Sequence, residues 1–175
     1  MEFSFLYAIP RTEVLDSFFL GLTKIAGSYG QLWVIVAALL LIFKKTRKAG
    51  VSVLIAYLAV FLIGQLALKN LFSRPRPCQM DEAFALLVAR PSSSSFPSTH
   101  SAWAFGAATA IFMQHRKMGV AAYVVAALIG FSRLYMFLHF PTDVLFGMVL
   151  GIALGVLAHR ITMVLWKKIS RSDNA

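Results

Sequence analysis

The chain has 175 residues, of which 59% are hydrophobic and 14% are charged. An ordinary soluble domain carries about 45–50% apolar and about 25% charged residues, so this composition excludes a disordered chain and argues against a soluble domain. The length suits one compact bundle, and we expect residues 1–175 to form a single membrane-embedded domain.

Basic residues outnumber acidic ones, with 17 Lys and Arg against 7 Asp and Glu and a formal net charge of +10. In a soluble protein this excess would suggest a nucleic-acid partner. Here the basic residues lie at the ends of apolar runs, where anionic lipid head groups and the positive-inside rule account for them. We therefore predict a lipid bilayer as partner and no nucleic acid.

Residues 1–25 precede the first long apolar run. Thr12 is suited to cap a helix, and the apolar residues after it recur at helical spacing, with Glu13, Asp16 and Lys24 among them. This pattern predicts an amphipathic helix over residues 12–25 that lies in the membrane interface.

Five apolar stretches follow, each bounded by charge, glycine or proline, and we expect each to span the membrane. A full crossing needs about 20 residues, so the third stretch is short and must borrow length from its neighbours. The predicted fold class is therefore all-α, an integral membrane helix bundle with about five transmembrane helices and an N-terminal interfacial helix. The expected spans are residues 27–43, 50–68, 99–114, 118–138 and 143–166, which leaves 167–175 as a tail.

Lys and Arg counts on the two sides predict the orientation, because the richer side is usually cytoplasmic. Five spans place nine basic residues on the side of the 44–48 loop and the C-terminus, against seven on the other side. We therefore expect a cytoplasmic C-terminus and an outer N-terminus. The only cysteine, Cys78, would then be a free thiol in an outer loop, within reach of membrane-impermeant reagents.

Polar residues gather in three clusters, 69–77, 96–100 and 132–143, at the ends of the predicted spans. The five-span topology brings all three to the same membrane face. Cations, two histidines and a carboxylate at one depth indicate an anion site with acid–base capacity, and phosphate fits it because arginine donates to phosphoryl oxygens in pairs.

The local sequence around the histidines suits phosphoryl transfer. Residues 97–100 open a helix, whose free N–H groups bind anions. Asp143 follows His139 by four residues, across a proline that suits the first turn of a helix. The carboxylate can then orient one ring nitrogen while the other attacks phosphorus, and His100 can protonate the leaving group.

The three clusters contain Lys69-x6-Arg76-Pro77, Pro97-Ser98-x-His100 and Ser132-Arg133-x5-His139-x3-Asp143. In order and spacing they resemble the three-part signature of the type 2 phosphatidic acid phosphatase family. The resemblance implies a phosphatase that needs neither metal nor cofactor and forms a covalent phosphohistidine at His139, oriented by Asp143, with His100 as general acid. It also implies that the phosphoryl group is held by Lys69, Arg76, Ser98 and Arg133.

Three further residues in or beside the motifs can contact phosphate. Thr99 stands where family members usually have glycine, and its N–H can still donate to phosphate. Arg74 can contact phosphate or attract lipid head groups, and Ser132 can contact phosphate or pack a helix interface. The chain also departs from the family in its first 25 residues, which stand where members commonly have the first of six spans.

The sequence therefore predicts hydrolysis of a phosphate or diphosphate from a membrane lipid at the outer face. Family resemblance and orientation favour undecaprenyl diphosphate, with phosphatidylglycerophosphate and phosphatidate as alternatives. A phospholipid-binding transporter is the non-enzymatic alternative, although it would not need the His139–Asp143 pair. Gly147, Gly151 and Gly155, at spacing four, predict close helix packing within the bundle or in a homo-oligomer.

Overall fold

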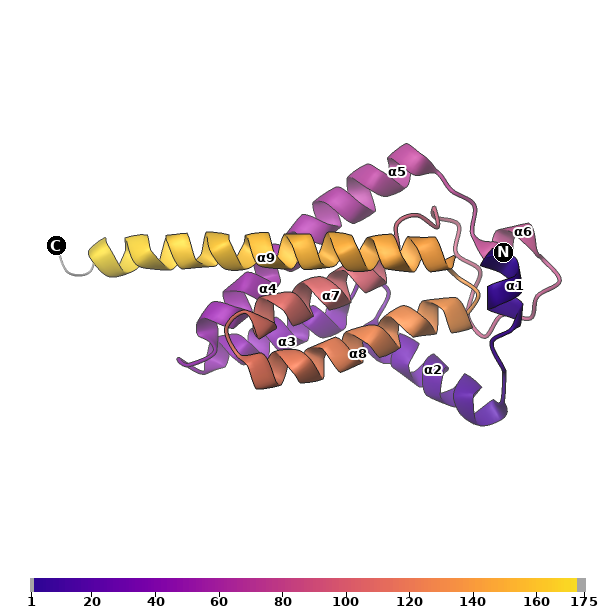
Figure 1. The fold of residues 1–175 in the computed structure, drawn as a ribbon, viewed down its shortest axis with the longest axis horizontal. Helices are drawn as coiled ribbons and strands as arrows, with labels where there is room; N and C mark the ends of the chain where they lie inside the picture. The colour runs from indigo at the N-terminus through magenta and orange to yellow at the C-terminus, as the bar shows by residue number, and fades with distance from the viewer. Residues whose placement is uncertain (1, 173–175) are drawn as a thin grey trace.

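A computed structural model describes residues 2–172 of the chain, and these form helices joined by short connections and one longer loop over residues 81–98 (Figure 1). No strand occurs among these residues, which confirms the all-α prediction. The helices are α1 (Glu2–Tyr7), α2 (Glu13–Ala26), α3 (Gln31–Ile42), α4 (Arg47–Val60), the π-helical η1 (Phe61–Leu68), α5 (Lys69–Phe72), α6 (Pro77–Met80), α7 (Thr99–Phe112), α8 (Arg116–Tyr135) and α9 (Pro141–Ser172).

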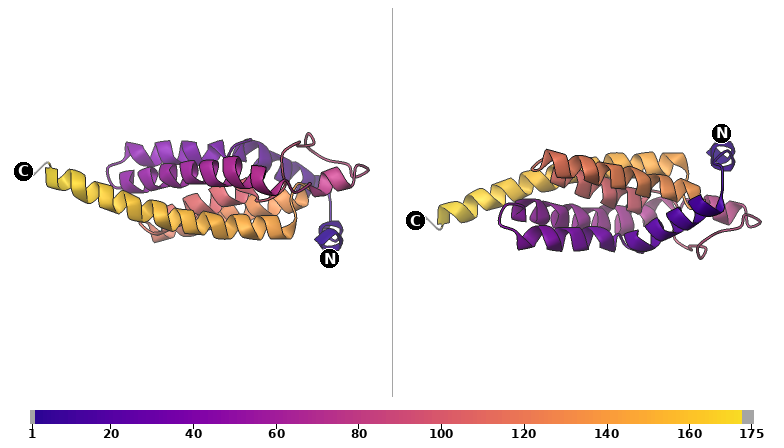
Figure 2. Two further views of the ribbon diagram at one scale, coloured as in Figure 1. Left: turned by 90° about the horizontal axis from the view of Figure 1, so that it is seen from above. Right: turned by 90° about the horizontal axis from the view of Figure 1, so that it is seen from below.

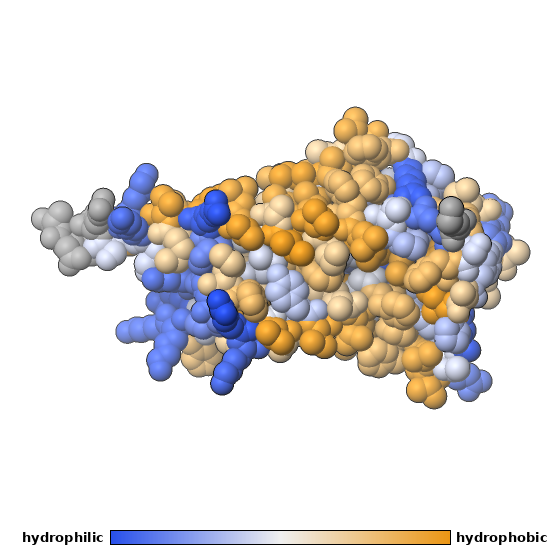
Figure 3. All heavy atoms as spheres, viewed as in Figure 1, coloured by the Kyte–Doolittle hydropathy of each residue, from blue (hydrophilic) through white to orange (hydrophobic). Residues whose placement is uncertain are grey.

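Five helical segments run along the long axis of the molecule, and each contains the core of one predicted span (Figures 1 and 2). α4, η1 and α5 follow one another without a break and form the second segment. On the face shown in Figure 3, hydrophobic atoms cover the middle of the molecule, with hydrophilic atoms towards both ends. This surface is the one expected of a bundle that crosses a bilayer several times.

Three segments are long and apolar enough to cross a membrane: Arg47–Met80, Arg116–Tyr135 and Pro141–Ser170. A fourth crossing exists if α2 and α3, which are bent by 58° at their junction, form one broken span. The protein is thus a multi-pass membrane protein. α7 does not qualify, because 14 residues extend only about 21 Å against a hydrocarbon core of about 30 Å. The predicted total of five crossings stays a prediction.

α7 lies at the centre of the bundle and packs against α4, α8 and α9. Eleven of its fourteen residues are buried, most of them alanine, glycine, serine or threonine. The predicted glycine stripe lies on α9 against this helix. A Cβ atom on Gly147 would stand 2.4 Å from the carbonyl oxygen of Ser98, and one on Gly151 would stand 2.3 Å from the carbonyl oxygen of Ala102. The stripe therefore serves close packing within the bundle.

The N-terminal region follows the prediction in part. Thr12 caps α2, since its Oγ1 accepts a hydrogen bond from the Leu15 N–H at 3.3 Å. The short helix α1 lies near α6 and the start of α9 (Figure 1). Its Phe3 ring packs edge-on against the Phe140 ring, with the ring centres 5.3 Å apart. At the other end, α9 continues through the first residues of the predicted tail, and residues 173–175 lie outside the described residues.

Candidate active site

The three polar clusters meet at one end of the bundle, as predicted, around a cavity of about 700 Å³. The first cluster lies in α5 and its connection to α6, the second opens α7, and the third joins α8 to α9. Six of the predicted site residues line this cavity: Lys69, Arg76, Thr99, His100, Arg133 and His139.

Lys69 and Arg76 are almost fully buried and are held by the serine run that precedes the second motif. The Lys69 ammonium donates to the carbonyl oxygen of Ser94 at 2.8 Å. The Arg76 guanidinium donates from Nε to the Ser93 carbonyl oxygen at 2.8 Å and from Nη2 to the Ser93 hydroxyl at 3.1 Å. Sequence reasoning missed this role, and the only signal for it was four consecutive serines beside a motif.

Arg133 extends from the last turn of α8 and is 2% exposed. Its Nε donates to the hydroxyl of Ser132 at 3.1 Å, and its Nη2 donates to the hydroxyl of Thr23 in α2 at 2.6 Å. Ser132 in turn donates to the carbonyl oxygen of Ile129 at 2.6 Å. Ser132 is not among the lining residues of the cavity, and its contacts orient Arg133.

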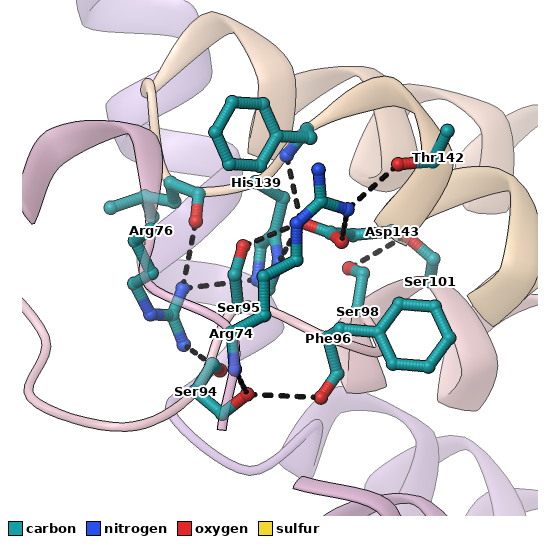
Figure 4. Close-up of polar contacts among 12 residues, drawn as sticks. Arg74, Arg76, Ser94, Ser95, Phe96, Ser98, Ser101, His139, Thr142 and Asp143 are labelled. Carbon is teal, nitrogen blue, oxygen red and sulfur yellow. Dashed lines mark hydrogen bonds and ion pairs between the residues drawn. The ribbon is translucent and has the colours of Figure 1, made fainter. Parts of the chain in front are cut away.

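His139 lies in the connection between α8 and α9, with its Nε2 atom 3.1 Å from Nη1 of Arg76 (Figure 4). A guanidinium can only donate, so this Nε2 presents its lone pair and the ring proton belongs on Nδ1. Burial lowers the pKa of His139 well below its usual range, and the charges of Arg76 and Lys69 lower it further. The imidazole is therefore neutral at pH 7, the form that a nucleophile requires.

Asp143 lies in the first turn of α9, where Pro141 begins the helix as predicted, and its side chain is fully buried. Its Oδ2 accepts hydrogen bonds from the Ser95 hydroxyl at 2.5 Å and the Phe140 N–H at 2.9 Å. The same oxygen is 3.7 Å from Nδ1 of His139, beyond hydrogen-bond distance. Nδ1 has no hydrogen-bond partner among the described residues.

Arg74 contacts Asp143 (Figure 4). It is absent from the residues that line the cavity. Its Nη1 donates to Oδ1 of Asp143 at 2.6 Å, and its Nη2 donates to a carboxylate oxygen of Glu2 at 2.7 Å. Its guanidinium lies over the Phe140 ring, 4.3 Å from the ring centre. Burial raises the pKa of Glu2, but hydrogen bonds from Thr142 and Arg74 outweigh it and lower the pKa overall.

Residues 98–100 begin α7, as predicted, but they face different surroundings. Ser98 is buried away from the cavity, with its hydroxyl 3.0 Å from that of Ser101, so its role in phosphate binding stays a prediction. Thr99 lines the cavity and donates to the Gln65 side chain at 3.2 Å. His100 donates from Nε2 to the carbonyl oxygen of Gly27 at 2.8 Å.

The Thr99 side chain occupies space that Gly64 leaves free in η1. A Cβ atom on Gly64 would stand 3.3 Å from the Thr99 methyl carbon, closer than an ordinary contact. The helix that faces the second motif therefore has room for threonine in place of the usual glycine. Among residues 2–172, no three His, Cys, Asp or Glu side chains gather in a way that could hold a metal ion.

The family model of the PAP2 superfamily matches residues 45–167, which include all three motifs. The chain belongs to the PAP2 superfamily. PAP2 membrane lipid phosphatases are hydrolases, and they need no metal ion. The resemblance of the three motifs to this family is thus confirmed.

Two relatives and one crystal structure illustrate this PAP2 similarity. The chain is 34% identical over 134 residues to an undecaprenyl-diphosphatase of Sulfolobus acidocaldarius, and the aligned part covers 75% of this chain and 65% of that protein. It is 29% identical over 152 residues to undecaprenyl-diphosphatase BcrC of Bacillus subtilis, and the aligned part covers 87% of this chain and 77% of that protein. The crystal structure of a PAP2 type phosphatidylglycerolphosphate phosphatase from Bacillus subtilis superposes with a TM-score of 0.68 at 33% identity, covering 86% of this chain and 78% of that one.

Proposed function

We propose that this PAP2 protein hydrolyses a lipid phosphate or diphosphate through a phosphohistidine at His139. The observation that carries the proposal is the buried His139 in the wall of a cavity that Lys69, Arg76 and Arg133 also line, with its Nε2 atom 3.1 Å from Arg76. Three cations around one nucleophile suit a phosphoryl group, whose charge is spread over several oxygens.

In the first step, Nε2 of His139 attacks phosphorus while the bond between phosphorus and the leaving oxygen breaks. Arg76 already reaches Nε2, so it can bind the phosphoryl group where the new bond forms. Asp143 stabilises the positive charge that develops on the ring, and we expect its 3.7 Å separation from Nδ1 to shorten to a hydrogen bond when substrate binds. Water then hydrolyses the phosphohistidine.

We assign the protonation of the leaving oxygen to His100. Its Nε2–H donates to the Gly27 carbonyl oxygen in the structure, so this N–H must turn from Gly27 to the leaving oxygen. His100 must be in its imidazolium form for this step, because it then becomes neutral imidazole when it gives up the proton. Lipid monophosphates depend most on this step, because an alkoxide is a poor leaving group.

Undecaprenyl diphosphate is our first candidate substrate, supported by the names of two relatives. Phosphatidylglycerophosphate is the second, supported by the name of the similar crystal structure, and phosphatidate is a third lipid to be tested.

We further propose that the cavity faces the outside and that the chain crosses the membrane five times, with α7 as a short crossing enclosed by its neighbours. A phospholipid-binding transporter with this cavity would bind these lipids without cleaving them.

The decisive experiment measures phosphate release by purified protein in detergent with EDTA, using undecaprenyl diphosphate, phosphatidylglycerophosphate and phosphatidate. We expect turnover of at least one lipid, none with His139→Ala, and wild-type turnover with His115→Ala, a histidine at the far end of the bundle. Binding without release by the wild-type protein would favour the transporter. Activity that EDTA removes and magnesium restores would contradict the metal-free mechanism.

A further inference from the structure

One wall of the cavity comes from a part of the chain that carries none of the three family motifs. The last turn of α2 and its connection to α3 contribute Thr23, Lys24, Gly27, Ser28 and Tyr29 to the lining. Lys24 therefore adds a fourth cation to the cavity that Lys69, Arg76 and Arg133 line.

Two hydrogen bonds attach this wall to residues of the site itself. Thr23 accepts a hydrogen bond from Arg133 at 2.6 Å, and the Gly27 carbonyl oxygen accepts one from His100 at 2.8 Å. Lys24 lies between these two points in the last turn of the helix. Its backbone is thus held at a fixed place on the rim of the cavity, while its side chain is exposed.

The charge on Lys24 is not neutralised within the protein. No ion pair among residues 2–172 involves Lys24, and no Asp or Glu is among the described residues that line the cavity. The three motif cations line the same cavity as the nucleophile and can hold one phosphoryl group. A fourth, unpaired cation at the rim fits a second phosphate group further from His139.

We propose that Lys24 binds the second phosphate group of a lipid diphosphate, the one that stays on the lipid. The proposal rests on the proposed function and makes Lys24 a specificity determinant for diphosphate over monophosphate. As the bond between His139 and the terminal phosphorus forms, the bond from that phosphorus to the bridging oxygen breaks. The bridging oxygen leaves with the lipid monophosphate, and the Lys24 ammonium stabilises the negative charge that the departing group gains.

The test compares two substrates that differ only in the second phosphate, farnesyl diphosphate and farnesyl monophosphate. We expect Lys24→Ala to lower kcat/KM for the diphosphate about tenfold or more, the size of one lost charge-assisted contact, and to change the monophosphate value by about twofold at most. Lys24→Arg should restore the diphosphate rate because it keeps the charge. Lys45→Ala, a lysine at the far end of the bundle, is the matched control and should affect neither substrate.

Equal losses on both substrates would overturn the proposal, because Lys24 would then serve the reacting phosphoryl group or the membrane surface. An unchanged diphosphate rate would overturn it as well.

A second measurement does not depend on turnover. Inorganic diphosphate should raise the melting temperature of the wild-type protein more than that of Lys24→Ala, whereas orthophosphate should raise both equally. If the wild-type protein cleaves neither lipid, the proposed function fails, and the melting shifts alone decide the role of Lys24. Equal shifts with inorganic diphosphate would then overturn it.

Discussion

At the scale of single residues, the site holds its buried cations with neutral oxygens. Lys69, Arg76 and Arg133 are each 6% exposed or less, and they donate to serine, threonine and backbone oxygens. Burying a charge without a counter-ion costs free energy, so an anion that enters the cavity recovers part of that cost. The buried carboxylate of Asp143, beside them, hydrogen-bonds to Arg74 and Ser95.

We predict that Asp143→Asn lowers kcat by about three to four orders of magnitude, as expected when a catalytic histidine loses the carboxylate that selects its tautomer. KM should change little, because Asp143 does not line the cavity. Steady-state kinetics on the best lipid substrate measure the effect, with Glu82→Gln in the exposed loop as control. A loss below about tenfold would show that Asp143 does not orient His139.

The neutral state of His139 predicts how stability depends on pH. Because folding lowers the pKa of His139, the unfolded chain takes up a proton below about pH 6.5 that the folded chain does not bind. Stability should therefore fall as the pH drops from 7 to 5.5, by about 1 kcal/mol from this group. Melting curves should show a smaller drop for His139→Gln than for the wild type, whereas His115→Gln should behave as the wild type.

The contacts of Arg74 favour a positioning role over phosphate binding. We predict that Arg74→Ala lowers kcat about 10–100-fold, because Asp143 loses the donor to Oδ1, and leaves KM for lipid phosphate nearly unchanged. Glu2→Gln should lower kcat less, since within residues 2–172 the Glu2 carboxylate accepts hydrogen bonds from Arg74 and Thr142 and has none with Asp143. A rise in KM at constant kcat would show that Arg74 binds phosphate instead.

At the scale of helices, the contact between α7 and α9 positions the site. α7 carries Thr99 and His100 and α9 carries Asp143, so the spacing of these two helices sets the distances between motifs. Both helices approach closely because small residues face each other, with Gly151 against the backbone of Ala102. Dispersion contacts of this kind replace the hydrophobic driving force, which is weak between helices in lipid.

We predict that Gly151→Ala lowers the stability by about 1–3 kcal/mol, because its Cβ would lie 2.3 Å from a backbone oxygen that cannot turn away. The control is Gly21→Ala in α2, where a Cβ would meet nothing within 4 Å and should be neutral or slightly stabilising. Thermal melts in detergent and residual phosphatase activity measure both. Equal melting temperatures for the two variants would contradict the close contact.

At the scale of the whole molecule, the structure corrects the expectation for Cys78. The sequence predicted a thiol accessible in an outer loop, but Cys78 is fully buried under α1 and the 81–98 loop, in a cluster with Leu6 and Phe137. Local hydropathy could not predict that Cys78 is buried, because the apolar residues around it come from distant parts of the chain. The wild-type protein should therefore not react with a maleimide.

Orientation is tested with an added cysteine at each end of the bundle. We predict that a membrane-impermeant maleimide labels Ala83→Cys in intact cells and labels Lys45→Cys only after the cells are opened, because the basic 44–48 loop stays in the cytoplasm. Both positions are exposed, and the wild-type chain is the unlabelled control. The reverse pattern would place the cavity on the cytoplasmic side and remove the case for an outer-leaflet substrate.

The sequence by itself determined the cores of the long helices and the end of the bundle at which the motifs meet. It did not predict the short helices α1 and α6 or the π-helical turn in η1. Helix starts at Thr99 and Pro141 follow from local chemistry, and apolar runs of similar length must return the chain to the same end. Only the tertiary structure decided what surrounds the motifs. Arg74 reaches Asp143 across 69 residues and Arg133 reaches Thr23 across 110. Such contacts depend on the angles and distances between packed helices, which neither spacing nor periodicity along the chain records.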